Sequence, residues 1–121
     1  MTHSLEVFFK DQIIFYSDGK WLHPLFELED FLSKSDYNPS TLLVKDKIIG
    51  RAAALILAHF GIKNVHAQIL SSTGKDALEL QGIKFKFNEL VDRVICRTEK
   101  MLQEEHNPEV AYQLIKSLIK S

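Results

Sequence analysis

The feature that most constrains the fold is a nearly uncharged segment, AAALILAHF at residues 52–60, with an apolar run on either side of it. A helix from about 48 to 60 is expected, and because it is apolar nearly all round it must be internal. Gly61 is placed to end that helix. The runs at 41–44 and 64–70 predict two buried strands. A strand, helix and strand of this size connect parallel neighbours through a right-handed crossover, which predicts the α/β class.

Two further segments predict strands of the same sheet. Residues 5–17 contain two apolar runs around Lys10, Asp11 and Gln12, a pattern typical of a hairpin. Residues 83–87 alternate apolar side chains with lysines, and outward lysines are typical of a protected edge strand. The expected sheet is therefore five-stranded, mixed and mostly parallel.

Apolar spacing and capping residues predict the remaining helices. These are expected over 21–35, over 72–81 with Ser72 or Thr73 as cap, from Asn88 to about 102, and over 107–120 with Asn107 as cap. With helices on both faces of the sheet, the chain would form a three-layer α/β/α sandwich. At 121 residues it is most simply one domain over 1–121, with 107–120 as an appended helix.

Composition narrows the classes of function. The net charge is −1 and the sequence pI about 6.5, so no basic field would attract nucleic acid or an anionic membrane. Cys96 is the one cysteine, which excludes an internal disulfide and suits a reducing compartment. The N-terminal residues show no signal-peptide pattern, and the uncharged run 52–61 is half the length of a membrane span. A cytoplasmic protein without nucleic-acid or membrane partners is expected.

Charged and hydroxyl side chains follow the two central strands. The loops KDKIIG and SSTGK would leave the carboxyl ends of parallel neighbours, so they should lie together on one rim of the sheet. Each loop leads into a helix N-terminus, which favours anions. A small anionic or phosphate-bearing ligand is the expected guest. The candidate ligand-binding residues here are Lys45, Asp46, Lys47, Gly50, Arg51, Ser71, Ser72 and Thr73.

Simpler roles remain open for these residues. Asp46 could only cap its helix, with the two lysines in solvent. The TGKD stretch is not a phosphate loop, because Asp76 stands where a Ser or Thr would follow the lysine. Cys96 next to apolar residues is more simply structural than nucleophilic. His66 is more simply a packing histidine, whereas His23 has a better claim to a cleft.

The stretches DGKWLHPLFELEDF at 18–31 and LLVKDKIIGRAAALILAHFGIKNVHAQILS at 42–71 resemble a small prokaryotic family, domain of unknown function (DUF) 1893. The resemblance runs from about Val7 to Arg97 and is most specific in KDKIIGRAAA at 45–54. It implies a cytidine-deaminase-like fold without an established activity. It also implies that the hairpin lies beside strand 41–44, with the strands at 64–70 and 83–87 beyond.

A zinc deaminase places a Glu two residues after its first metal ligand and a P-C-x-x-C turn at the next helix start. In this chain Glu27 follows His23 by four residues, and KDKIIG replaces the cysteine turn. No metal or other cofactor is therefore expected. The family also carries an Asn-Arg pair and a Cys-Pro-x-Glu stretch near its C-terminus. Only Arg97 and Glu104 of this chain match them, which adds Arg97 to the ligand-binding candidates.

Three functions are compatible with these residues. The first is binding of a small anionic, nucleotide-like ligand at the rim. The second is a zinc-independent enzyme in which Asp46 acts as general base, assisted by His23 or Lys47. The third is an interaction protein whose last helix forms a homodimer.

Overall fold

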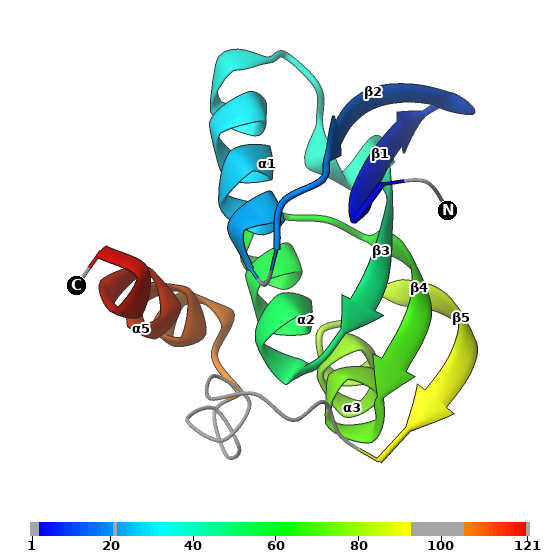
Figure 1. Cartoon of the computed structure of the whole chain (residues 1–121), viewed down its shortest axis with the longest axis vertical. Helices are drawn as coiled ribbons and strands as arrows, with labels where there is room; N and C mark the ends of the chain where they lie inside the picture. The colour runs from blue at the N-terminus through cyan, green and yellow to red at the C-terminus, as the bar shows by residue number, and fades with distance from the viewer. Residues whose placement is uncertain (1–2, 21, 93–105, 121) are drawn as a thin grey trace.

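A computed structural model describes residues 3–20, 22–92 and 106–120 (Figure 1). The elements, in chain order, are β1 Leu5–Phe9, β2 Gln12–Ser17, α1 His23–Lys34, a 3-10 turn Pro39–Thr41, β3 Leu43–Ile49, α2 Arg51–His59, β4 Asn64–Ser71, α3 Ser72–Leu80, β5 Lys84–Val91 and α5 Pro108–Lys120. Within these ranges no helix is long and apolar enough to cross a bilayer.

The five strands form one sheet in the order β2-β1-β3-β4-β5. This order confirms the expected place of the hairpin beside β3 and of β5 at the far edge. β1 runs antiparallel to both β2 and β3, whereas β3, β4 and β5 run parallel. The sheet is therefore mixed, and the expectation of a mostly parallel sheet was wrong. The reason is that β1 lies between β2 and β3 and so makes two antiparallel pairings.

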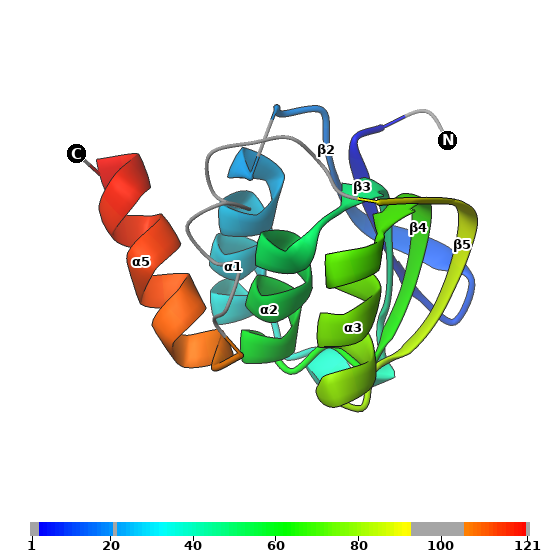
Figure 2. The same ribbon diagram turned by 90° about the horizontal axis from the view of Figure 1, so that it is seen from below.

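Helix α2 is the centre of the hydrophobic core. The side chains from Ala52 to Leu57 are at most 4% exposed, and the expected internal helix is confirmed. Figure 2 shows α1, α2 and α3 on one side of the sheet, with α5 on the outer side of α1 and α2. The three-layer sandwich is not confirmed, because the helices of the described ranges lie on one side of the sheet.

The KDKII segment lies in β3, although it was expected to be a loop. β3 continues to Ile49, and its last residues pair with Ile69 and Leu70 of β4. Gly50 is the N-cap residue of α2, which begins at Arg51 and not at about 48. The β-branched residues Ile48 and Ile49 favour the strand, and a strand can alternate charged and apolar side chains between its two faces.

The ends of the other helices are partly as expected. Ser71, one residue earlier than predicted, caps α3: its Oγ accepts a hydrogen bond from the Gly74 amide at 2.9 Å. Asn107 caps α5 as predicted, since its Oδ1 accepts from the amides of Glu109 and Val110. Asn88 is no helix cap but a residue of β5, which extends to Val91. The rest of the helix expected there lies outside the described residues.

Candidate functional site

The starts of α2 and α3 are pressed together at one end of the sheet. A Cβ placed on Gly74 would lie 2.9 Å from the carbonyl oxygen of Ile49 and 3.0 Å from the carbonyl carbon of Gly50. Real Cβ atoms do not approach that closely, so only glycine permits this contact. The expected adjacency of the two segments is confirmed. We call this surface the helix rim, formed by Gly50, Arg51, Ser71, Ser72, Thr73 and Gly74.

Arg51 contributes a buried cation to the helix rim. Its side chain is 4% exposed, and its Nη2 lies 2.5 Å from Nδ1 of His106, just before α5. Because a guanidinium can only donate, Nδ1 accepts and the imidazole proton is on Nε2. Both residues make further polar contacts. Arg51 therefore links the first residue of α2 to the segment just before α5. It also places a positive charge at the helix rim.

The hydroxyl groups of the rim are partly used by the fold. Ser71 is fully buried, and besides capping α3 its Oγ lies 3.1 Å from Oγ1 of Thr73. The Ser72 hydroxyl donates to the carbonyl of Val91 at 3.3 Å, which ties α3 to β5. Thr73, which is half-buried, has the side chain best placed for contact with a ligand.

Asp46 lies on the helix-covered face of β3, below the rim. Its ladder partners Leu5 and Ala67 are both fully buried. Burial raises the pKa of the Asp46 carboxyl from 3.8 to about 7, although the backbone N–H groups of Ile48 and Lys47 act in the opposite direction. The hydrogen bond from the Ile48 amide to Oδ1 is long, at 3.4 Å. Asp46 is thus neither a loop residue nor a helix cap, and its carboxyl titrates near neutral pH.

The two lysines of this strand do not join the rim. Alternation along β3 places Lys45 and Lys47 on the face opposite Asp46. Nζ of Lys45 lies 4.8 Å above the ring of Phe8 in β1. The structure therefore brings Gly50, Arg51 and the Ser71–Thr73 segment together and separates the lysines from them.

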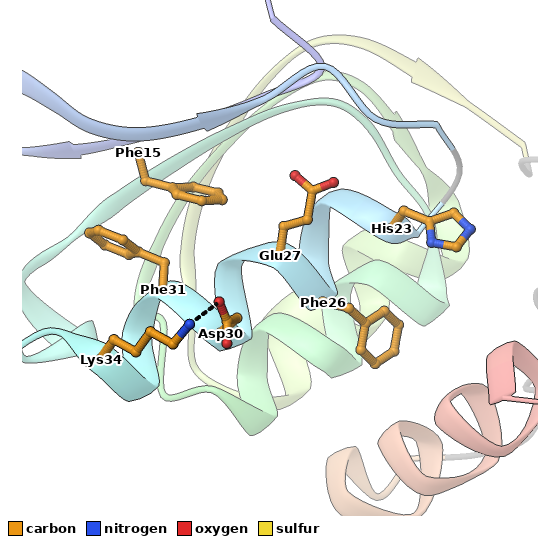
Figure 3. A pocket seen from close by; sticks show the side chains of 7 residues that line it. All are labelled: Phe15, His23, Phe26, Glu27, Asp30, Phe31 and Lys34. Atoms are coloured by element: carbon orange, nitrogen blue, oxygen red, sulfur yellow. Dashed lines mark hydrogen bonds and ion pairs between the residues drawn. The ribbon is translucent and has the colours of Figure 1, made fainter.

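His23 is the first residue of α1. It lines a shallow hollow of about 580 Å³ together with side chains of α1 and Phe15 of β2. Figure 3 shows these side chains, among them Phe15 and Phe31 facing one another and the Asp30–Lys34 ion pair, which is 3.1 Å long. No hydrogen bond joins His23 to Asp46 within the described ranges. Arg97, Glu104 and Cys96, also named from the sequence, lie outside the described residues.

Among the residues that the structure describes, no three His, Cys, Asp or Glu side chains come together as a possible metal site.

Two features of the structure were missed from the sequence. The first is His106, which was not linked to Arg51 because the two are 55 residues apart. The second is a cavity of about 220 Å³ on the sheet face that carries Lys45, lined also by Glu6. His66 lies there too, with its Nε2 2.9 Å from Oδ1 of Asn88. The alternation of side chains along the strands could have predicted that Glu6, Lys45 and His66 share this face of the sheet.

Comparison with known proteins gives a family but no activity. The family model of TM1506, described as a domain of unknown function (DUF1893), matches residues 2–119. No curated protein matches the chain. The crystal structure of a DUF1893 family protein, TM1506 from Thermotoga maritima, superposes with a TM-score of 0.83 at 28% sequence identity. The match covers 94% of this chain and 79% of that one. The chain belongs to the DUF1893 family.

Proposed function

We propose that this protein binds a small anionic molecule, phosphate-bearing or nucleotide-like, at the helix rim. The observation that carries the proposal is the convergence of two helix N-termini, where Gly74 packs so closely on Ile49 and Gly50 that a Cβ would not fit, beside the buried cation of Arg51. Each N-terminus carries a partial positive charge from its helix dipole, and these charges and the guanidinium favour an anion.

Asp46 supports this proposal because of its protonation state. A carboxylate with an ordinary pKa, on the strand that leads into the rim, would oppose an anionic ligand at pH 7. With a pKa of about 7, the Asp46 carboxyl is protonated in about half of the molecules at that pH. The protonated form is neutral and can donate a hydrogen bond. An anion at the rim would favour this form further.

A cytidine-deaminase-like fold and a cytoplasmic location are part of the same proposal. The strand order β2-β1-β3-β4-β5 supports the fold, since it agrees with the order that the resemblance implies. The single cysteine supports the location. The proposed ligand site then corresponds to the cleft of a deaminase, but it uses Arg51 and backbone groups in place of zinc.

The experiment compares Thr73→Glu with the unchanged protein by titration calorimetry against inorganic phosphate and a panel of nucleotides. Glutamate in the first turn of α3 suits the helix dipole, so the variant should stay folded. Its charge should weaken anion binding about tenfold or more. Gln113→Glu, an exposed position of α5, makes the same charge change away from the rim and should bind normally.

Two outcomes would contradict the proposal. One is that neither phosphate nor any nucleotide binds to the unchanged protein. The other is that Thr73→Glu and Gln113→Glu bind the same compound equally well, because the site would then lie elsewhere.

The raised pKa of Asp46 favours a second candidate, an enzyme in which this carboxyl is the general acid or base. A catalytic group with a pKa near the working pH is efficient in either role. Lys47 is on the other face of β3, so Asp46 would act without it. The test is to incubate the protein with a metabolite panel and follow consumption by NMR. Asp46→Asn should abolish any turnover, and equal turnover by both proteins would exclude this role.

A further inference from the structure

The face of the sheet away from the helices carries a row of polar side chains. Glu6, Lys45, His66 and Lys86 are successive ladder partners across β1, β3, β4 and β5. Figure 2 shows α1, α2 and α3 on the other side of the sheet. Parallel strands are usually covered on both faces, and no helix of the described ranges covers this face of β3, β4 and β5.

Glu6 is the exceptional member of the row. Its side chain is only 8% exposed, and it lines the cavity of about 220 Å³ together with Lys45, His66, Gln68 and Asn88. Within the described ranges the Glu6 carboxylate has neither a hydrogen bond nor an ion pair. Because Glu6 lines the cavity while the rest of its side chain is buried, a cation entering the cavity can reach the carboxylate at a partly shielded position.

Lys45 is the nearest candidate partner, yet it does not pair with Glu6. The two residues are direct neighbours across the β1–β3 ladder, and side chains at such positions are within reach of one another. The ammonium of Lys45 instead lies 4.8 Å above the ring of Phe8, on the same strand as Glu6. An acidic and a basic group thus flank one cavity without neutralising each other.

The rest of the cavity lining is polar and consists of His66, Gln68 and Asn88. Nε2 of His66 lies 2.9 Å from Oδ1 of Asn88, and because an amide oxygen only accepts, Nε2 donates. The Asn88 amino group and the Gln68 amide remain able to orient a ligand by hydrogen bonds. The volume is below the 300–1,000 Å³ or so that is usual for drug-sized ligands, which indicates a smaller molecule.

We infer that this cavity is a second ligand site, which binds a small zwitterion of the amino-acid class with its ammonium group at Glu6 and its carboxylate at Lys45. The ligand ammonium supplies the ion-pair partner that the Glu6 carboxylate lacks within the described ranges. Lys45 needs only to leave the Phe8 ring to meet the ligand carboxylate. This site is independent of the helix rim, because it is on the other face of the sheet from Asp46.

The test is calorimetric titration of the whole chain with the common α-amino acids, β-alanine and 4-aminobutyrate. One or more of them should bind, and its N-acetyl and amide derivatives should bind about tenfold more weakly or worse, since each loses one charge. Glu6→Gln keeps the size of the side chain and should weaken binding by a similar factor. Glu79→Gln, an exposed position of α3, is the matched control and should bind normally.

Lys45→Met provides a second variant if Glu6→Gln fails to fold, and it should weaken binding of the unmodified compound but not of its amide. The inference is overturned if no member of the panel binds at millimolar concentration, or if Glu6→Gln and Lys45→Met both bind as the unchanged protein does. Phosphate binding at the helix rim should be unchanged in both variants, so failure here is distinguishable from failure of the rim proposal.

Discussion

The guanidinium Nη2 of Arg51 lies 2.5 Å from Nδ1 of His106, and this contact joins the first residue of α2 to the segment that leads into α5. A second bond supports it, from Nε2 of Gln81 to the His106 carbonyl at 3.0 Å. α5 then packs on α2 through Ala111 and Ile115, both fully buried. The appended helix is thus tied to the helix rim by polar contacts as well as by apolar packing.

His106→Ala should loosen α5. The variant removes an acceptor from a buried cation, and a hydrogen bond to a charged group contributes about 1.5–3 kcal/mol. We expect a loss of that order in the free energy of unfolding, measured by chemical denaturation. Hydrogen exchange of the α5 amides should accelerate more than that of β4. His3→Ala, at the opposite end of the chain, is the control, and equal losses in both variants would contradict the assignment.

Asp46 should make the protein less stable as the pH rises. Its folded pKa is raised above its ordinary value of 3.8, so the folded state holds the proton more tightly than the unfolded state does. The favourable contribution is complete below about pH 4 and is lost as the pH rises through about 7. The Asp46→Asn variant should lack this dependence. Relative to the unchanged protein it should gain stability between pH 5 and pH 8, on the order of 2–4 kcal/mol.

The measurement is the difference in unfolding free energy between Asp46→Asn and the unchanged protein across that pH range. Taking this difference cancels the pH dependence of the unfolding free energy that all other titrating groups contribute. Asp36→Asn, an exposed carboxyl, serves as the control and should show no such trend. A difference for Asp46→Asn that does not change with pH would refute the raised pKa.

Gly74→Ala should destabilise the protein although it places a good helix former in α3. The new Cβ would lie 2.9 Å from the Ile49 carbonyl oxygen, and overpacking of this kind costs about 1–3 kcal/mol. The added Cβ should also push the starts of α2 and α3 apart, and we therefore expect weaker anion binding at the rim. Gly82→Ala is the comparison: its Cβ would meet no atom within 4 Å, and the cost there comes from a positive φ of 69°. Normal anion binding by Gly74→Ala would count against the rim.

Tyr112→Phe should weaken the contact between α5 and α1. The Tyr112 hydroxyl donates to Glu29 of α1 and accepts from Lys116 Nζ at 2.7 Å, while its ring stacks on His59 at 4.3 Å. We expect a loss of about 1 kcal/mol in unfolding free energy, the usual contribution of one such bond. Burial, and next Glu29, raise the Tyr112 pKa, so one tyrosine should ionise above its ordinary range in an alkaline titration. Loss of that late titration in the variant would identify it.

The segments whose structure was predicted correctly share one property: their sequence signals are local or periodic. The all-apolar stretch of α2, the Asn107-Pro108 start of α5 and the hairpin turn at Lys10 and Asp11 each depend on neighbouring residues. Such signals act over a few residues and survive in any tertiary context. They were sufficient for most element types but not for residues 45–49 and 88–91, which form strands. The strand order was expected from the family resemblance.

The site was harder to predict because it depends on which face of the sheet each side chain points to. Lys45, Asp46 and Lys47 are consecutive, so they were grouped as one cluster, but a strand sends them to opposite faces. The contact between Arg51 and His106 joins residues far apart in the sequence, and no local pattern reports it. Glu6 alternates with Leu5 and Val7, a pattern typical of an outward strand residue, and only the packing of its neighbours reveals its burial.

The most direct test of the rim is NMR of the isotope-labelled protein during addition of inorganic phosphate and of the best-binding nucleotide. The account predicts saturable shifts in the amide signals of Arg51, Ser72, Thr73 and Gly74. Signals of Lys45 and His66 on the other sheet face should stay in place. No shift at the rim, or shifts confined to the face of Lys45, would contradict the central claim.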